Sequence, residues 1–369
     1  MHVITGLNRG GAEMLLVNLL SRTDQQKFIP TVVSLTDGGA LKEKIEGFGI
    51  PVISLGMKRG ALSILALIRL FRITRSFNPD IVQGWMYHAN LFAILASKLS
   101  IKKPKVFWGI FHCIEDLSSR KTLFKLVVKI GAILSSQIDG ITNNSFKSIN
   151  QHAKLGYLAD RTTAIPNGVN TDLFHPDYDA YKSVRRELCV SDGTYLVGLI
   201  GRFDPLKDHC NFLKAVQIII ATHSDVKFLL VGNGLDESNS WLSEQVRCLE
   251  LNQKIFLLGE RSDIPRLMAS LDVSVSSSKS EGMPVVIAES MSCGIPCVVT
   301  DVGDSSVLVG ESGISVPPCN SEALADAITN ILDLPDTDRK SLGSSARRRV
   351  MDNFSLGSFV KKYETLYGD

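Results

Sequence analysis

Residues 272–300 read DVSVSSSKSEGMPVVIAESMSCGIPCVVT, and they carry the clearest indication of the architecture. It begins with a short apolar run, Asp272–Ser276, and ends with another, Pro296–Thr300. Between them, Pro284–Cys293 has the composition of a helix, and Pro284 suits its first turn because proline needs no backbone donor there and has a fixed φ. Two buried strands joined by a helix form a βαβ unit, so the stretch predicts a parallel sheet.

The same alternation extends over both halves of the chain. The runs expected as strands are His2–Leu7, Pro30–Leu35, Val52–Leu55, Asp80–Gln83, Val106–Ile110, Gly140–Asn143, Tyr195–Gly201, Val226–Gly232 and Ile255–Leu258. The helices expected between them include Ala12–Ser21, Leu41–Phe48, Ile64–Arg75, Ala89–Ser97, Phe212–Ala221, Trp241–Glu250 and Ser321–Leu332. The pattern predicts two α/β domains. The polar segment 171–190, which holds Pro176, is interpreted as the linker between them.

Two parallel sheets in one chain suggest where a ligand binds. Ligands of open parallel sheets bind beyond the carboxyl ends of the strands. We therefore expect a site in a cleft between the two domains, because ligand sites often lie at such an interface. The alternative is a pair of purely structural domains without a shared site.

The composition is that of a globular protein. The chain has 369 residues, of which 44% are hydrophobic and 29 are glycine, which excludes disorder and collagen. Seven cysteines are an odd and sparse number, so we expect a reducing compartment, the cytoplasm, rather than a disulfide framework. Cys293 and Cys297 have no second pair nearby, so zinc is not expected. We expect neither a transmembrane span nor a signal peptide.

The net charge of +2 conceals an asymmetry between the halves. Residues 1–170 contain 21 Lys and Arg but only 10 Asp and Glu, so this half is basic. Residues 171–369 contain 19 Lys and Arg but 28 Asp and Glu, so this half is acidic. A basic first half suggests an anionic partner, either nucleic acid or an anionic membrane surface. The sequence contains neither an aromatic-basic RNA signature nor a DNA-reading motif, so nucleic acid is not the expected partner.

Two carboxylates flank the start of the helix expected at Pro284–Cys293. Glu281 stands just before it and Glu289 lies inside it, while Gly282 allows the backbone to approach a ligand closely. The free N–H groups from Met283 to Val286 form a seat for an anion, helped by the helix dipole. One carboxylate can then chelate a vicinal diol while the other meets a sugar ring. The alternative is a capping Glu281 and a solvated Glu289, although Glu289 follows an apolar run.

A basic loop follows the strand expected at Tyr195–Gly201. Residues 201–208 read GRFDPLKD, which places Arg202 and Lys207 just past the carboxyl end of that strand. An arginine fork combined with a lysine point charge suits a diphosphate. Two ordinary surface cations are the alternative interpretation of this pair taken alone.

The other glycine-rich segments are weaker signals. Gly10-Gly11 follows the first expected strand and offers backbone N–H groups at a helix start. It matches neither the dinucleotide fingerprint nor a Walker loop. Gly232-Asn233-Gly234 also follows a strand, but it lacks the third glycine of the fingerprint.

Two histidines and two D-x-D pairs have positions of interest. His112 and His88 each follow an expected strand on the side of the expected cleft, although a lone histidine is more often structural. The pairs at 177–179 and 336–338 have the spacing of metal-binding carboxylates. Because both lie in polar connecting segments, we expect loops there and no metal site.

The motifs together resemble one family. The Glu281 to Glu289 segment matches the E-x7-E motif of the retaining glycosyltransferases of family 4, also called group 1, which have the GT-B fold. Further matching segments, spread over nearly the whole chain, are Gly10–Glu13, Ile165–Val169, Gly201–Phe203 with Lys207, Gly232–Gly234, Gly259–Arg261, Ser280–Gly282, Phe354–Ser355 and Tyr363–Tyr367. Their number and order are specific for the family and not for the sugar. One departure is Asn170, which stands where the family usually has Asp.

The resemblance implies a GT-B fold, in which two Rossmann-like domains face each other across a cleft. The acceptor-side domain would be 1–172 and the nucleotide-sugar-binding domain 190–353. The C-terminal helix, at 354–369, would cross back and pack on the first domain.

The resemblance also implies a nucleotide-sugar donor, with a UDP-sugar favoured. The residues it makes catalytic are Glu281, His112, Arg202 and Lys207, and those it makes donor-binding are Gly11, Arg202, Lys207, Arg261, Gly282, Met283, Pro284, Val285 and Glu289. Arg202 and Lys207 would bind the diphosphate and Glu289 the ribose hydroxyls. Glu281 and His112 would contact the donor sugar. Arg261 would lie beside the base, and Gly11 would approach the phosphate or the sugar.

A retaining reaction without an obvious nucleophile implies a front-face displacement, as proposed for the family. The leaving diphosphate would help to deprotonate the acceptor hydroxyl, while Arg202, Lys207 and the helix amino terminus stabilise its charge. Neither a metal nor another cofactor is then needed. The expected acceptor is a glycan, in particular a lipid-linked one used in building a bacterial surface polysaccharide.

The segment Ser118–Ser135 has the pattern of an interfacial helix. Its cations are Arg120, Lys121, Lys125 and Lys129, and its apolar residues include Leu123, Phe124, Leu126, Val127, Val128 and Ile130. With Lys102, Lys103 and Lys105 nearby, it favours peripheral contact with the inner face of the cytoplasmic membrane. An ordinary amphipathic surface helix is the alternative.

Three other functions compete with sugar transfer. One is another GT-B enzyme, such as a sugar-nucleotide epimerase or a phosphorylase, which the paired glutamates and the basic loop disfavour. Another is a non-catalytic module that binds a nucleotide sugar or nucleic acid, which the basic first half permits but no RNA-binding or DNA-reading motif supports. A nicotinamide-dependent oxidoreductase is disfavoured because the dinucleotide fingerprint is absent.

Overall fold

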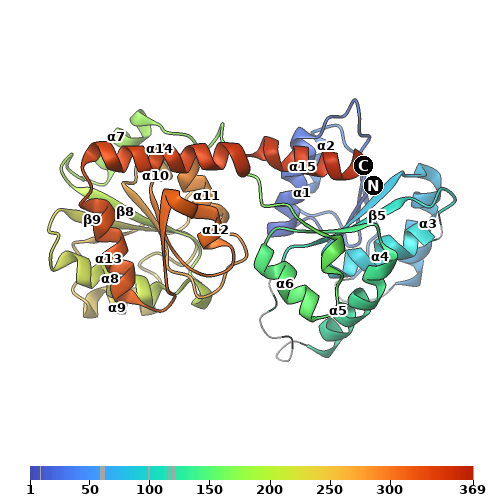
Figure 1. Ribbon diagram of the computed structural model, residues 1–369, viewed down its shortest axis with the longest axis horizontal. Helices are drawn as coiled ribbons and strands as arrows, with labels where there is room; N and C mark the ends of the chain where they lie inside the picture. Colours follow the sequence, from blue (N-terminus) through green and yellow to red (C-terminus); the bar gives the residue numbers. More distant parts are fainter. Residues whose placement is uncertain are drawn as a thin grey trace. The chain divides into compact units, whose positions relative to one another are not determined.

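The structure is a computed structural model that describes residues 1–8, 10–58, 63–98, 100–112, 114, 117 and 121–368. The chain divides into two compact units (Figure 1). The first comprises Met1–Gly168 and Phe359–Asp369, and the second comprises Val169–Ser358. Each unit contains a parallel sheet flanked by helices, which confirms the expected α/β class.

The described part of the first unit has a seven-stranded sheet in the order β3-β2-β1-β4-β5-β6-β7. Its strands are β1 (His2–Ile4), β2 (Val32–Ser34), β3 (Val52–Ser54), β4 (Ile81–Trp85), β5 (Lys105–Ile110), β6 (Gly140–Asn143) and β7 (Thr162–Ala164). Its helices are α1 (Gly11–Arg22), α2 (Lys42–Glu46), α3 (Ile64–Phe77), α4 (Tyr87–Lys98), α5 (Thr122–Leu134) and α6 (Phe146–Lys154). The strand order reverses between β1 and β4, which is the switch point of this sheet.

The core of the first unit explains why its strands are visible in the sequence. Val3 of β1 and Val82 of β4 pack with Leu70 of α3 and Phe92 of α4, and all four side chains are buried. A parallel sheet covered by helices on both faces needs strands that are apolar along their whole length. The apolar runs of the first half therefore mark six of the strands, whereas β7 has the composition TTA and was not expected.

The described part of the second unit has a six-stranded sheet in the order β10-β9-β8-β11-β12-β13. Its strands are β8 (Tyr195–Ile200), β9 (Val226–Val231), β10 (Ile255–Leu257), β11 (Val273–Ser276), β12 (Cys297–Thr300) and β13 (Gly313–Val316). Its helices are α7 (Tyr178–Glu187), α8 (His209–Ile220), α9 (Ser240–Cys248), α10 (Ile264–Met268), α11 (Val285–Ser292), α12 (Ser305–Val309), α13 (Ser321–Leu332) and α14 (Asp336–Asn353). Helices α8, α9 and α13 cover one face of the sheet, and α7, α10, α11 and α14 cover the other (Figure 1).

The linker expected at 171–190 is wrong, because the structure has helix α7 there. Ala180 and Val184, four residues apart, are buried in the core of the second unit. Arg185 of the same helix pairs with Asp272 at the start of β11. The segment is polar because its apolar stripe is narrow, and its composition therefore resembles that of a connecting loop.

The loops expected at the two D-x-D pairs are also wrong. Asp177 is the N-cap of α7, and its carboxylate accepts hydrogen bonds from the N–H groups of Asp179 and Ala180, both at 2.9 Å. Asp336 and Asp338 lie in the first turn of α14. Carboxylates stabilise helix amino termini by capping free N–H groups and by opposing the helix dipole. These acidic pairs therefore begin helices.

Helix α15 (Leu356–Gly368) begins in the second unit, and most of its length belongs to the first. The Tyr363 hydroxyl donates a hydrogen bond to Oγ1 of Thr142 at 3.2 Å, and the Tyr363 ring stacks on that of Trp85. The Tyr367 hydroxyl donates to Oε1 of Gln83, also at 3.2 Å. These contacts confirm that the C-terminal helix returns to the first domain.

Candidate functional site

Two loops meet at the switch point of the second sheet, where the strand order reverses. One loop, Gly201–Asp208, follows β8, and the other, Ser277–Pro284, follows β11. Because β8 and β11 are parallel neighbours, their carboxyl ends lie at the same edge of the sheet. The backbone N–H of Lys279 donates to the carbonyl oxygen of Leu206 at 2.7 Å. The two loops are therefore joined through their backbones.

An ion pair also joins these loops. Nζ of Lys207 lies 2.6 Å from Oε1 of Glu281, and the Ser278 hydroxyl donates to the same oxygen at 2.7 Å. The side chains of Lys207 and Glu281 are 25% and 14% exposed, so a ligand can still reach both. The two residues are 74 positions apart in the sequence, and the fold brings them into direct contact.

Helix α11 begins where the second of these loops ends. Pro284 is its N-cap, in an extended conformation, and no side chain caps the helix there. The first N–H groups of a helix have no partner within it, so those of Val285 and Val286 can bind an anion with the help of the helix dipole. The Met283 side chain is buried in the core, which leaves its backbone for a ligand.

The loop after β12 holds the backbone that carries Glu281. The N–H of Asp304 donates to the carbonyl oxygen of Gly282 at 2.8 Å. Gly303 has a φ of +58°, and a Cβ there would lie 2.3 Å from the carbonyl oxygens of both Glu281 and Gly282. Glycine is therefore required at this position for both its backbone conformation and the close approach.

Glu289 lies on α11 in different surroundings from Glu281. Its neighbours Ile287 and Ala288 are completely buried. Burial raises the pKa of Glu289 from 4.5 to about 7, because a low-dielectric environment disfavours the charged form. The carboxyl group therefore populates both protonation states near neutral pH.

Arg202 leaves the carboxyl end of β8, as expected, but it already has a partner. Its Nε and one terminal nitrogen lie 3.0 and 2.9 Å from Oδ2 of Asp204. The backbone N–H of Leu206 and then the Arg202 guanidinium lower the pKa of Asp204. The Arg202 side chain is 72% exposed, so its guanidinium is accessible to an anion in solution.

The site residues expected in the first unit are Gly11 and His112. Gly11 is the first residue of α1, and a Cβ there would meet nothing within 4 Å. His112 follows β5 and is half-buried, and its carbonyl oxygen accepts a hydrogen bond from the Ser148 hydroxyl at 3.0 Å. His88, in the first turn of α4, has a pKa lowered by burial.

Comparison with known protein families identifies both halves of the chain. Residues 9–173 match the family described as Glycosyltransferase Family 4, and residues 194–334 match the family described as Glycosyl transferases group 1. The chain belongs to the group 1, family 4 glycosyltransferases. The family resemblance seen in the sequence is confirmed.

Two relatives of this glycosyltransferase are bacterial enzymes. A UDP-Gal:alpha-D-GlcNAc-diphosphoundecaprenol alpha-1,3-galactosyltransferase of Escherichia coli is 25% identical over 337 residues, which cover 89% of this chain and 85% of that protein. An N,N'-diacetylbacillosaminyl-diphospho-undecaprenol alpha-1,3-N-acetylgalactosaminyltransferase of Campylobacter jejuni is 24% identical over 344 residues, which cover 87% and 88%. The crystal structure of Anabaena HepE in complex with UDP has a TM-score of 0.85 at 24% identity and covers 100% of this chain and 99% of that one. This structural likeness establishes the GT-B fold.

Arg261 of this glycosyltransferase lies in an ion-pair cluster. Its Nε is 2.8 Å from Oδ1 of Asp263, and another of its nitrogens is 3.1 Å from Oε1 of Glu187 on α7. Arg266 binds the same two carboxylates. The cluster lowers the pKa of Asp263 and raises that of Arg261. Arg261 therefore anchors α7 to the loop after β10, apart from any contact it makes with a ligand.

Sequence reasoning missed three residues that shape the loops of the second unit. Ser278 binds Glu281 directly, Gly303 fixes its backbone, and Lys279 pairs with Asp208 at 3.1 Å. The serine-rich run after β11 was a signal for the first of these. Gly303 gave no comparable signal, because its role depends on a loop distant in the sequence.

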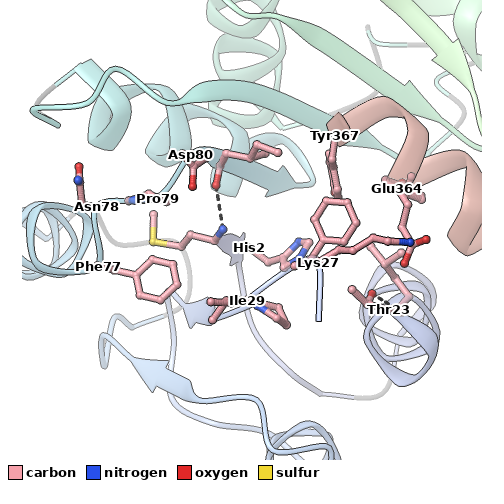
Figure 2. Close-up of a pocket in the computed structure, with 16 residues that line it drawn as sticks. His2, Thr23, Lys27, Ile29, Phe77, Asn78, Pro79, Asp80, Glu364 and Tyr367 are labelled. Carbon is pink, nitrogen blue, oxygen red and sulfur yellow. Dashed lines mark hydrogen bonds between the residues drawn. The ribbon is translucent and has the colours of Figure 1, made fainter. Parts of the chain in front are cut away.

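A cavity of about 330 Å³ in the first unit is not part of the candidate site. It lies at the amino ends of β1 and β4, whereas His112 follows the carboxyl end of β5. Figure 2 shows Ile29 and Phe77 at this cavity together with Glu364 and Tyr367 of α15. Its position makes it a feature of the packing of α15 on the first unit.

Helix α5 exposes part of its apolar surface. Val127 and Val128 are buried in the core, so these two residues of the expected stripe do not face solvent. Leu123, Leu126 and Ile133 are exposed. Arg120, one of the cations expected beside them, lies outside the described residues.

The described ranges contain no group of three or more His, Cys, Asp or Glu residues that could hold a metal ion. None of the helices in them combines the length and apolar character that a membrane span requires.

Proposed function

We propose that this glycosyltransferase moves a sugar from a UDP-sugar to a lipid-linked glycan, with retention of configuration, during synthesis of a bacterial surface polysaccharide. The name of the E. coli relative includes a UDP-sugar donor, and the names of both relatives include a diphosphoundecaprenol-linked acceptor. The observation that carries the proposal is the contact between Lys207 and Glu281 immediately before the amino terminus of α11.

In this proposal the two domains have different roles. The second unit, Val169–Ser358, binds the nucleotide sugar, and the first unit, Met1–Gly168 with Phe359–Asp369, forms the acceptor side. The assignment follows from the chemistry of the second unit, whose switch-point loops combine cations, free helix N–H groups and two carboxylates.

The diphosphate of the donor would bind Lys207, Arg202 and the N–H groups at the start of α11. A lysine ammonium has three donors, so Lys207 can keep its contact with Glu281 while it binds a phosphate oxygen. Arg202 would share its guanidinium between Asp204 and the diphosphate. The N–H groups of Met283, Val285 and Val286 add no charge but offer donors in fixed positions, whereas Pro284 has no N–H and contributes its fixed φ.

The nucleoside and the sugar would contact the two glutamates differently. Glu289, in its ionised form, would accept hydrogen bonds from both ribose hydroxyls, and Arg261 would lie near the base. Glu281 would face the donor sugar close to the reacting carbon, where its negative charge stabilises the positive charge that develops there. His112 and Gly11 would contact the donor from the first domain.

The proposed reaction is a front-face displacement. The bond from the anomeric carbon to the diphosphate breaks, and the acceptor oxygen forms its bond on the same face. The departing phosphate oxygen takes the proton of the acceptor hydroxyl. Lys207, Arg202 and the α11 amino terminus stabilise the UDP product, so the proposal needs no metal ion.

A transfer assay tests this function. The purified protein is first screened by thermal shift with UDP-galactose, UDP-glucose and UDP-N-acetylgalactosamine. Each donor is then incubated with N-acetylglucosaminyl-diphosphoundecaprenol, and the product is analysed by NMR. An α-linked disaccharide on the lipid supports the proposal. An epimerised or phosphorolysed nucleotide sugar, or binding without any product, would contradict it.

We propose further that α5 and its neighbours contact an anionic membrane, at the cytoplasmic face where lipid-linked acceptors are available. Ile64 and Leu65 of α3 and Leu123 and Ile133 of α5 are between 53% and 76% exposed. Helices α3, α4 and α5 contain no acidic residue, and contacts of α4 with both of the others make them neighbours. Exposed apolar side chains on helices that contain cations but no acidic residue suit an interface with anionic lipid.

Liposome flotation tests the membrane contact. With vesicles containing anionic phosphatidylglycerol, the wild type should float, and a variant with Arg120, Lys121, Lys125 and Lys129 changed to Gln should stay in solution. A control with the exposed Lys214, Lys340 and Arg348 of the second unit changed to Gln should float like the wild type. Equal flotation of all three proteins would contradict the proposal.

A further inference from the structure

A buried hydrogen-bond network of the first unit ends on the backbone of His112. The hydroxyl of Ser148, on α6, lies 3.0 Å from the carbonyl oxygen of His112 and 3.0 Å from Nδ2 of Asn143. Ser148 and Asn143 are 0% and 1% exposed. Because the Asn143 amide nitrogen donates, the hydroxyl oxygen of Ser148 accepts there, and its own proton is available for the carbonyl.

His152 determines that the Ser148 hydroxyl donates its proton to the His112 carbonyl oxygen and not elsewhere. Its Nδ1 lies 2.8 Å from the carbonyl oxygen of Ser148, and a carbonyl can only accept, so Nδ1 carries the proton. Its Nε2 then accepts a hydrogen bond from the Tyr87 hydroxyl at 2.7 Å. Nδ1 is also 3.3 Å from the Ser148 hydroxyl, but a protonated nitrogen cannot accept from it. The Ser148 proton therefore points to His112.

The same helix holds the loop at a second point. The side-chain oxygen of Gln151 accepts a hydrogen bond from the N–H of Ile114 at 3.0 Å. Ser148 and Gln151, three residues apart and therefore on one side of α6, bind the backbone at His112 and two residues beyond it. Strand β5 ends two residues before His112 and holds the backbone on its amino side, so a fixed carbonyl on its carboxyl side restricts ψ and thereby the direction of the His112 Cα–Cβ bond.

We propose that Ser148 is a positioning residue of this glycosyltransferase, whose hydroxyl orients the backbone of His112 and thereby its ring for contact with the donor sugar. This inference rests on the proposed function, which places His112 at the donor. Small displacements of a group at the reacting centre slow catalysis strongly. The UDP portion binds the other domain in this scheme, so the effect of Ser148 falls on kcat and not on KM.

The first test replaces Ser148 with Ala, which removes the hydroxyl with little change in volume. With UDP-galactose, or whichever of the three UDP-sugars the wild type transfers, kcat should fall about tenfold. The KM for that donor should stay within about twofold of the wild-type value. Ser135→Ala is the control, because Ser135 is equally buried in the same unit and its hydroxyl donates to the carbonyl oxygen of Ala132. Its kcat should be unchanged.

A double-mutant cycle shows whether Ser148 acts through His112. His112→Ala should lower kcat more than Ser148→Ala does, and the double variant should be no slower than His112→Ala alone. A further tenfold loss in the double variant would overturn the inference. Wild-type kcat in Ser148→Ala would also overturn it while leaving the proposed function intact.

Hydrogen exchange at the Ile114 amide provides a readout that does not need activity. If the wild type transfers no sugar, the proposed function fails, and this measurement still tests the orienting contact. Faster exchange in Ser148→Ala than in Ser135→Ala would support the contact. Equal protection in the two variants would overturn it.

Discussion

The loops around Glu281 and the loop around His112 are held by different means. In the second unit, loops after β8, β11 and β12 are joined by backbone hydrogen bonds and by the close approach at Gly303. In the first unit, the backbone at His112 is held by side chains of α6. The geometry at Glu281 therefore depends on backbone contacts between three loops in addition to the Lys207–Glu281 ion pair, whereas the backbone at His112 depends on individual side chains.

Lys207→Ala should slow transfer more than any other change, because it removes the ion pair with Glu281 while the hydrogen bond from the Lys279 N–H to the Leu206 carbonyl still joins the two loops. We expect kcat to fall about 10²–10³-fold, because the leaving diphosphate loses a charged donor in a preorganised site. The fold should survive, as measured by circular dichroism. Lys279→Ala is the matched control, since Lys279 is on the neighbouring loop and pairs with Asp208. A loss of similar size in both variants would show that general loop damage is responsible.

Gly303→Ala disturbs the backbone contact between the loop after β12 and the loop that carries Glu281. The new Cβ would lie 2.3 Å from two carbonyl oxygens at a φ of +58°, so the loop must move. We expect the free energy of unfolding to fall by about 3 kcal/mol, measured by urea denaturation, together with a loss of transfer. Gly193→Ala is the control, because a Cβ at Gly193 meets nothing within 4 Å. Equal stability of the two variants would mean that the loop accommodates a side chain.

Glu289→Gln should change stability less than Gly303→Ala does, and it tests whether Glu289 differs from Glu281 in its protonation. The pKa of Glu289 is about 7 in the folded protein and 4.5 for an unperturbed glutamate, which represents the unfolded chain. Between pH 4.5 and pH 7 the folded protein therefore binds more protons at this group than the unfolded chain does. The free energy of unfolding then decreases as the pH rises through this range. The wild type should therefore lose about 2 kcal/mol of unfolding free energy between pH 5 and pH 8 from this group. The variant should lack that loss.

Donor binding by Glu289 should show the opposite trend with pH. Because the ionised carboxylate is the form that chelates ribose hydroxyls, the KM for the UDP-sugar should fall as the pH rises from 6 to 8. The KM of Glu289→Gln should be higher and independent of pH over this range. A wild-type KM that does not change between these pH values would contradict the assigned role.

The sequence predicted the parts of the fold that depend on continuous apolar runs. Strands such as β4, β5 and β9 are buried on both sides, and their residues show it directly. Helices α7 and α14 were missed because most of their residues are charged or polar and narrow apolar stripes attach them to the core. Pairing of β7 and β13 with the sheet edges depends on neighbours distant in the sequence, which a local pattern does not contain.

Site residues that directly follow a strand could be predicted from the sequence. Contacts between one loop and another, or between a loop and a helix, could not. Lys207 and Glu281 follow β8 and β11, and the order of strands in a parallel sheet explains why they meet. Asp204, which pairs with Arg202, was not assigned that role, because a two-residue spacing does not reveal which way the side chains turn. Ser148 lies on a helix that the apolar pattern did not mark, so no local signal linked it to His112.

Helix α15 has a consequence for engineering this enzyme. Phe359 and Tyr363 fill the interior of the first unit, although they come from the very end of the chain. A fragment that stops at Gly168 would lack both rings and leave a void lined by Trp85, so it should be insoluble on its own. Chimaeras that exchange donor-binding halves between relatives must therefore keep the last dozen residues with the amino-terminal half.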